Sequence, residues 1–174
     1  TFRAYEQTHP EDAMGPTSRA AAYLFSEFER LGVLQTELFI NDEMFNGREK
    51  PEPNPSVRAA FTQEIEKSDQ RADAALARSP NDRDALLAKV LNLGLEADYL
   101  AMVEKRNMAA VSTSKKASEL AERLLRAAPD CYDAYLAIGA ENYLLGLKPA
   151  PVRWLLRLYG ARTDKDEGIR KLEL

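Results

Sequence analysis

The protein has 174 residues, of which 45% are hydrophobic and 30% charged, with a formal net charge of −4 at pH 7. This length suffices for one hydrophobic core, and no shift in composition divides the chain into two domains. The mild negative charge disfavours a nucleic-acid-binding protein, which concentrates Lys and Arg on one face. Cys131 is the only cysteine, so no disulfide can form within the chain. Because no apolar stretch approaches the roughly 20 residues that span a bilayer, we expect a soluble protein, cytoplasmic or periplasmic, without membrane contact.

The first part of the chain predicts two helices and a loop. Residues 1–9 resemble the last turns of a helix that Pro10 ends. A second helix should begin between Asp12 and Thr17 and run to Gly32, which ends or bends it. Apolar residues continue at helical spacing toward residue 45, so this helix could extend further. Residues 46–55 hold three prolines among polar residues and predict an exposed loop.

The middle of the chain predicts a pair of long helices. Ser56 is the expected N-cap of a helix that ends at Arg78. The next helix, expected from about Asp82 to Glu104, is apolar nearly all round in its first half. A helix with that pattern is covered on more than one side.

The last part of the chain continues in the same way. Residues 107–113 are expected to form a turn, followed by a returning helix over 114–128 and an outgoing helix over 132–147. Prolines then interrupt the helical pattern near residue 150. Val and Ile are scarce and do not alternate with polar residues, so the fold class is predicted to be all-α.

The order of these features repeats along the chain. Pro80 and Pro129 each follow a polar helix and lead through a short turn into an apolar helix, and Pro10 opens a weaker copy. Such a recurrence predicts helical hairpins stacked into a solenoid. Six residues after Pro80 and Pro129 stand bulky residues, Leu86 and Tyr135. Ten residues after the three prolines stand Ala20, Val90 and Gly139. Small residues recur on the returning helices at Ala72, Ala75, Ala117 and Ala121.

These positions resemble those of the tetratricopeptide repeat family, a helix-turn-helix unit of about 34 residues. The resemblance implies a right-handed α-solenoid of antiparallel helical hairpins, with repeats longer than the family's usual unit. It implies a single repeat domain over residues 1–174. Both ends fall inside repeats, as expected of a piece of a longer solenoid.

The resemblance also implies a binding surface. In this family the outgoing helices line a concave groove that commonly binds peptides, so we expect a non-enzymatic scaffold for a protein or peptide partner. The corresponding positions are Thr17, Ala21, Leu24, Leu87, Leu91, Leu136, Ala140 and Tyr143. None is a charged donor, so the groove should be apolar rather than a clamp for a C-terminal carboxylate. Either a partner helix or peptide enters it, or the protein's own helices fill it.

A short amphipathic segment follows the prolines. Residues 152–159 are expected to form an inserted short helix with an apolar face, while Arg153 and Arg157 lie opposite and Trp154 broadens the apolar arc. Helices of this kind lie on membranes or anchor a partner. They also pack on a solenoid with their arginines in solvent, and we expect packing here because two turns are short for membrane binding.

Signals for catalysis are weak. His9 is the only histidine, and no Gly-rich phosphate loop or nucleophile elbow occurs. We therefore expect no enzyme activity, no cofactor and no metal site. Two alternatives to a scaffold remain open: a structural spacer within a larger enzyme or secretion assembly, and a carrier of a small apolar ligand between helices.

Overall fold

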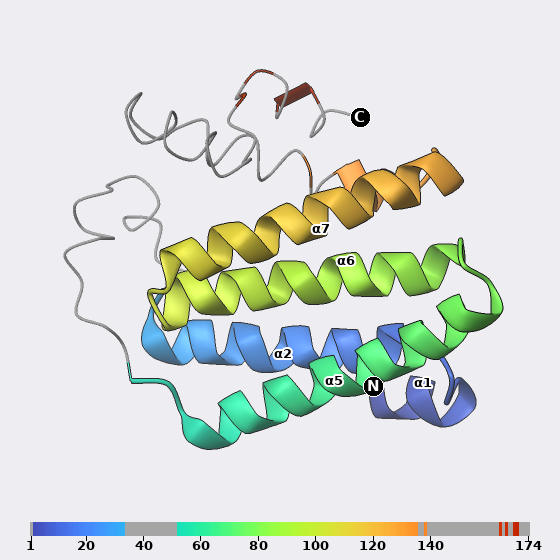
Figure 1. The fold of residues 1–174 in the computed structure, drawn as a ribbon. Helices are drawn as coiled ribbons and strands as arrows, with labels where there is room; N and C mark the ends of the chain where they lie inside the picture. The colour runs from blue at the N-terminus through green and yellow to red at the C-terminus, as the bar shows by residue number, and fades with distance from the viewer. Residues whose placement is uncertain are drawn as a thin grey trace.

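The computed structural model describes residues 2–33 and 52–135, together with Ile138, Asp164, Asp166, Ile169 and Arg170. Regular structure in this part of the chain is entirely helical, which confirms the all-α prediction (Figure 1). The helices are α1 (Phe2–Thr8), α2 (Met14–Leu31), α5 (Pro55–Arg78), α6 (Arg83–Asp98), the π-helical turn η1 (Tyr99–Val103) and α7 (Asn107–Ala127). The predicted helix over 152–159, with Arg153, Trp154 and Arg157, lies outside the described residues, as do Leu136, Ala140 and Tyr143.

Helix α2 begins inside the predicted window and ends where Gly32 was expected to act. Gly32 has φ 62° and ψ 29°, and its N–H bonds the carbonyls at the end of α2. Glycine adopts this left-handed conformation without a clash of Cβ, and it ends many helices in this way. The alternative of one helix running on toward residue 45 is therefore wrong.

The start of α5 differs from the prediction. Asn54, not Ser56, is the N-cap, because its side chain accepts hydrogen bonds from the backbone N–H groups of Ser56 (2.9 Å) and Val57 (3.3 Å). Pro55 occupies the first turn, where its fixed φ suits the helix and its missing N–H costs nothing. Of the loop predicted over residues 46–55, the structure describes 52–55: residues 52–54 are not helical, and Pro55 belongs to α5.

The second hairpin starts as predicted but turns earlier. Asp82 caps α6 by accepting a hydrogen bond of 2.9 Å from the N–H of Ala85. The turn after η1 occupies residues 104–106, where Lys105 has φ 56°. The predicted turn over 107–113 is wrong, since α7 already begins at Asn107. This stretch lacks Gly and Pro, and burial of Ala110 favours a helix there.

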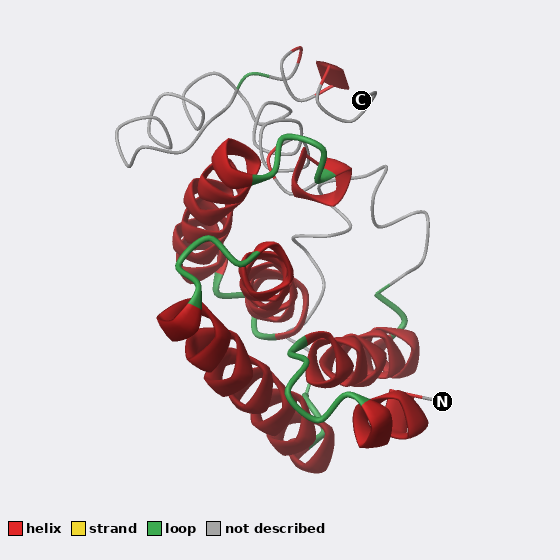
Figure 2. Cartoon of the chain, turned by 90° about the vertical axis from the view of Figure 1, so that its right-hand side faces the viewer, coloured by secondary structure: helices red, strands yellow, loops and turns green. Residues whose placement is uncertain are grey.

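The helices are arranged in two layers. Among the described helices, α1 packs on α2, α2 on α5, α5 on α6 and α6 on α7, and α2 also contacts α6 directly. In the end-on view, α2 and α6 form one layer and α5 and α7 the other (Figure 2). Helices α2 and α6 run in the same direction, and α5 and α7 run opposite to them (Figure 1).

Two apolar clusters and a contact between small residues hold the layers together. Leu24 and Phe28 of α2 pack with Phe61 of α5 and Tyr99 of η1. A second cluster joins α6 and α7 to the residues after Pro129, through Leu86, Val90, Ala121, Leu124, Cys131, Ala134 and Ile138. Small side chains let α5 and α6 approach closely: Ala72, Ala85 and Ala88 are buried together. Packing at these positions holds the two layers of helices together.

Candidate functional site

The predicted groove positions separate into buried and accessible residues. Thr17 and Leu24 are only 3% and 0% exposed, so they cannot contact a partner in this conformation. Thr17 bonds Ser68 of α5 and Asn92 of α6, and Leu24 packs with Phe61 of α5 and Tyr99 of η1. Ala21, Leu87 and Leu91 are half-buried and keep part of their surface in solvent. Two of the predicted groove residues, Thr17 and Leu24, therefore belong to the core.

Thr17 belongs to a buried polar junction that the sequence did not reveal. Thr17 of α2 donates to Asn92 Oδ1 of α6 at 2.9 Å, and Asn92 Nδ2 donates to Ser68 Oγ of α5 at 2.9 Å. The Ser68 and Thr17 hydroxyls are 2.8 Å apart, which closes a ring of three hydrogen bonds. The second Asn92 N–H reaches Asp69 at 3.0 Å. A buried network satisfied in this way fixes the register of the three helices, since any slip leaves polar groups unpaired.

The junction holds α2 beside α6, so residues that point away from the core on the two helices lie on neighbouring helices. On α6 these residues recur every three or four positions and therefore share one side of the helix. Phe25 of α2 is 51% exposed, and its ring meets Phe28 edge-on at 5.9 Å. We call this surface the α2–α6 face and define it by Ala21, Phe25, Leu87, Leu91, Gly94 and Asp98.

Two residues of the α2–α6 face have unusual surroundings. A Cβ added at Gly94 would meet no atom within 4 Å. Asp98 is exposed, and no ion pair involves it within residues 2–33 and 52–135. Surrounding protein nevertheless removes part of its hydration, and this desolvation raises the pKa of Asp98 to about 6. Since the side chain keeps an exposed edge, the raised pKa reflects partial rather than complete loss of water.

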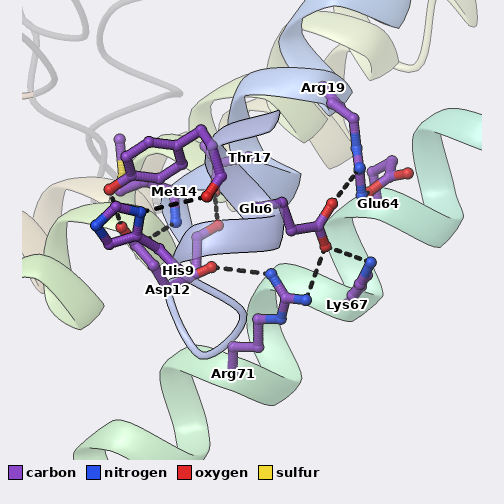
Figure 3. Close-up of polar contacts among 11 residues, drawn as sticks. Glu6, His9, Asp12, Met14, Thr17, Arg19, Glu64, Lys67 and Arg71 are labelled. Atoms are coloured by element: carbon purple, nitrogen blue, oxygen red, sulfur yellow. Dashed lines mark hydrogen bonds and ion pairs between the residues drawn. The ribbon is translucent and has the colours of Figure 1, made fainter. Parts of the chain in front are cut away.

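A second polar cluster connects α1 to the rest of the protein (Figure 3). The Glu6 carboxylate contacts Arg19 of α2 and both Lys67 and Arg71 of α5, with Arg71 at 2.7 Å. Arg19 also pairs with Glu64 at 2.6 Å. Hydrogen bonding from Lys67, with those from Arg71 and Arg19, lowers the pKa of Glu6 to about 2. We call these five residues the Glu6 cluster, and its role is to attach α1.

His9 lies at the end of α1 and supports the turn after it. Its ring stacks on Tyr5, with centroids 4.4 Å apart, and its Nδ1 is 2.8 Å from the Thr8 hydroxyl. The Tyr5 hydroxyl donates to Asp12 at 2.5 Å, and Asp12 in turn accepts from the N–H of Met14. This exposed arrangement orders the connection between α1 and α2.

The opposite end of α2 carries a third set of charged side chains. Glu27 is buried and accepts hydrogen bonds from Arg30 and from the N–H of Asn54, and Arg30 lowers the pKa of its carboxyl group. Glu104 pairs with Arg58 at 2.6 Å. Between them, the hydroxyl of buried Tyr99 has no hydrogen-bond partner in the structure. Glu27 and Glu104 each pair with an arginine. The bond from Asn54 to Glu27 and the ion pair of Arg58 with Glu104 connect the ends of neighbouring helices.

Among the described residues, no group of three or more His, Cys, Asp or Glu side chains is arranged to hold a metal ion. None of the described helices combines the length and apolar character of a bilayer-spanning segment. No protein-family model matches the sequence, and no curated protein or solved structure is similar to it.

Proposed function

We propose that the protein is a non-enzymatic scaffold that binds a helix or peptide of a partner protein on the α2–α6 face. The observation that carries this proposal is the 51% exposed side chain of Phe25 on α2, on the same pair of helices as the half-buried Leu91 of α6. Large apolar side chains exposed together on a rigid support commonly mark protein interaction sites.

The packing of the helices supports the same proposal. Helices α2 and α5 form one antiparallel hairpin and α6 and α7 another, and the first helices of the two hairpins contact each other. Hairpins of a tetratricopeptide-like solenoid stack in this manner, and their first helices share one face. In such a stack, the α2–α6 face would be the surface open to a partner.

The chemistry of the other polar clusters also favours a scaffold. Glu6, Glu27 and Glu104 are each neutralised by arginine, and Glu6 and Glu27 have lowered pKa values. A general base works best with a pKa near the operating pH. These carboxylates are therefore better suited to holding helices together than to moving protons.

Affinity capture from cells of the source organism tests the proposal when wild type is compared with Phe25→Glu. Ala74→Glu is the matched control, because it adds the same charge at an exposed position of α5. We expect a partner that both wild type and Ala74→Glu retain in stoichiometric amount, and that Phe25→Glu loses while remaining folded. A partner retained equally by all three proteins would rule out this face.

A further inference from the structure

Gly94 weakens α6 without any visible structural benefit. Glycine in a helix interior costs about 1 kcal/mol relative to alanine. Such a cost is usually offset where φ is positive or where another backbone lies too close for a Cβ. Neither reason applies, because Gly94 has ordinary helical backbone and open space where its Cβ would lie.

Asp98 stands one turn further along the same side of α6, about 6 Å along the helix axis. Its carboxylate is partly desolvated, and within the described residues no cation compensates it. Partial loss of hydration destabilises the charged form, which is the form present at pH 7. An asparagine would avoid this cost.

Gly94 and Asp98, one helical turn apart on α6, each lower the stability of the isolated protein, and both lie on the surface already assigned to binding. Local rules are broken in this way mainly at functional sites, where the compensation comes from a ligand. A glycine on an open helix face admits the backbone of another chain, and an uncompensated carboxylate attracts a cation. The inference that follows rests on the proposed function and specifies its partner.

We propose that the α2–α6 face binds an amphipathic helix whose backbone crosses α6 at Gly94 and whose Lys or Arg side chain pairs with Asp98. Apolar side chains of that helix would pack on Leu91 and Phe25. The occupant is a helix rather than an extended strand, because a strand needs hydrogen-bond partners for its backbone. The α2–α6 face presents helical residues whose N–H and C=O groups already bond within α2 and α6, whereas a helix satisfies its own backbone.

A displayed library of alanine-rich, 16-residue helices, with the residues of one side randomised, provides a defined probe. We expect the wild-type protein to enrich peptides that carry Lys or Arg at one fixed position beside an apolar stripe. The tightest peptide is then synthesised with a fluorophore, and its Kd is measured by anisotropy.

Variants of Asp98 test the charge pair. Asp98→Asn should weaken the selected peptide about tenfold, a value between those of exposed and buried ion pairs. Exchanging the charges, with Asp98→Lys in the protein and Glu in place of the basic residue in the peptide, should restore binding. Glu66→Gln, which removes an exposed carboxylate of α5, should leave the Kd unchanged. Recovery by charge exchange is a result that a merely structural role of Asp98 would not produce.

Gly94→Leu distinguishes failure of this inference from failure of the proposed function. Circular dichroism should first show that the variant is folded, as expected where the added side chain has open space. If Gly94→Leu abolishes binding but the enriched peptides lack a basic residue, the face binds helices and the role of Asp98 is wrong. If no peptide is enriched, or Gly94→Leu binds like wild type, the proposed face itself is wrong.

Discussion

Replacing Glu6 with Gln should weaken the attachment of α1 to the rest of the protein. The Glu6 side chain is 12% exposed and contacts Arg19, Lys67 and Arg71, and glutamine keeps its shape while removing its charge. A folded-state pKa of about 2, against 4.5 ordinarily, corresponds to about 3 kcal/mol of favourable interaction. Lys67 is 42% exposed, so water screens the cluster, and we expect a measured effect of about 1–2 kcal/mol.

Hydrogen exchange measures this effect directly, because α1 can open while the other helices stay folded. The N–H of His9 bonds the carbonyl of Tyr5 at 2.9 Å and reports on α1. At pH 7 its exchange should be about 5- to 30-fold faster in Glu6→Gln than in wild type, as the expected 1–2 kcal/mol requires. Glu66→Gln removes an exposed carboxylate of α5 and should leave this amide unaffected.

The lowered pKa of Glu6 also predicts how the effect of Glu6→Gln changes with pH. Because the pKa of Glu6 is lowered in the folded protein, its contribution is fully present above about 4.5 and is lost as the pH falls toward about 2. The ratio of exchange rates between variant and wild type should therefore approach one over that range. A ratio of one already at pH 7, or a ratio that does not change with pH, would refute this account of how α1 is held.

Three further predictions concern α6 and its neighbours. Asn92→Leu removes the amide that links Thr17 and Ser68, so urea unfolding should show a free energy of unfolding lower by about 1–3 kcal/mol. Gln70→Leu, at an exposed site of α5, should change it little. Gly94→Ala should raise the free energy of unfolding by about 0.5–1 kcal/mol, since the methyl group meets no atom; a loss would mean that this position is closely packed. Asp98→Asn should stabilise the protein at pH 7 but not below pH 3.8, because the raised pKa of Asp98 makes its charged form unfavourable as the pH rises toward about 6. An NMR titration of Asp98 with an ordinary pKa would contradict that last prediction.

Local signals in the sequence determined where most helices begin and end. Pro10 and Pro80 follow the ends of α1 and α5, Asp82 caps α6, and Gly32 ends α2, because each of these effects acts within a few residues along the chain. Local signals failed where two of them competed. Asn54 and Ser56 are both good N-caps, and only the structure shows that the Asn54 side chain accepts the bonds.

The tertiary structure decided which side of each helix is accessible. Leu24 and Leu91 both fitted the predicted groove, yet Leu24 is core because α2 packs directly on α5 and α6, whereas Leu91 keeps an exposed edge. The ring of Thr17, Ser68 and Asn92 joins residues far apart in the chain, and so do the contacts of Glu6. Periodicity determines which residues share a side of one helix, but the rotation of that helix against its neighbours depends on packing and on buried hydrogen bonds between distant segments.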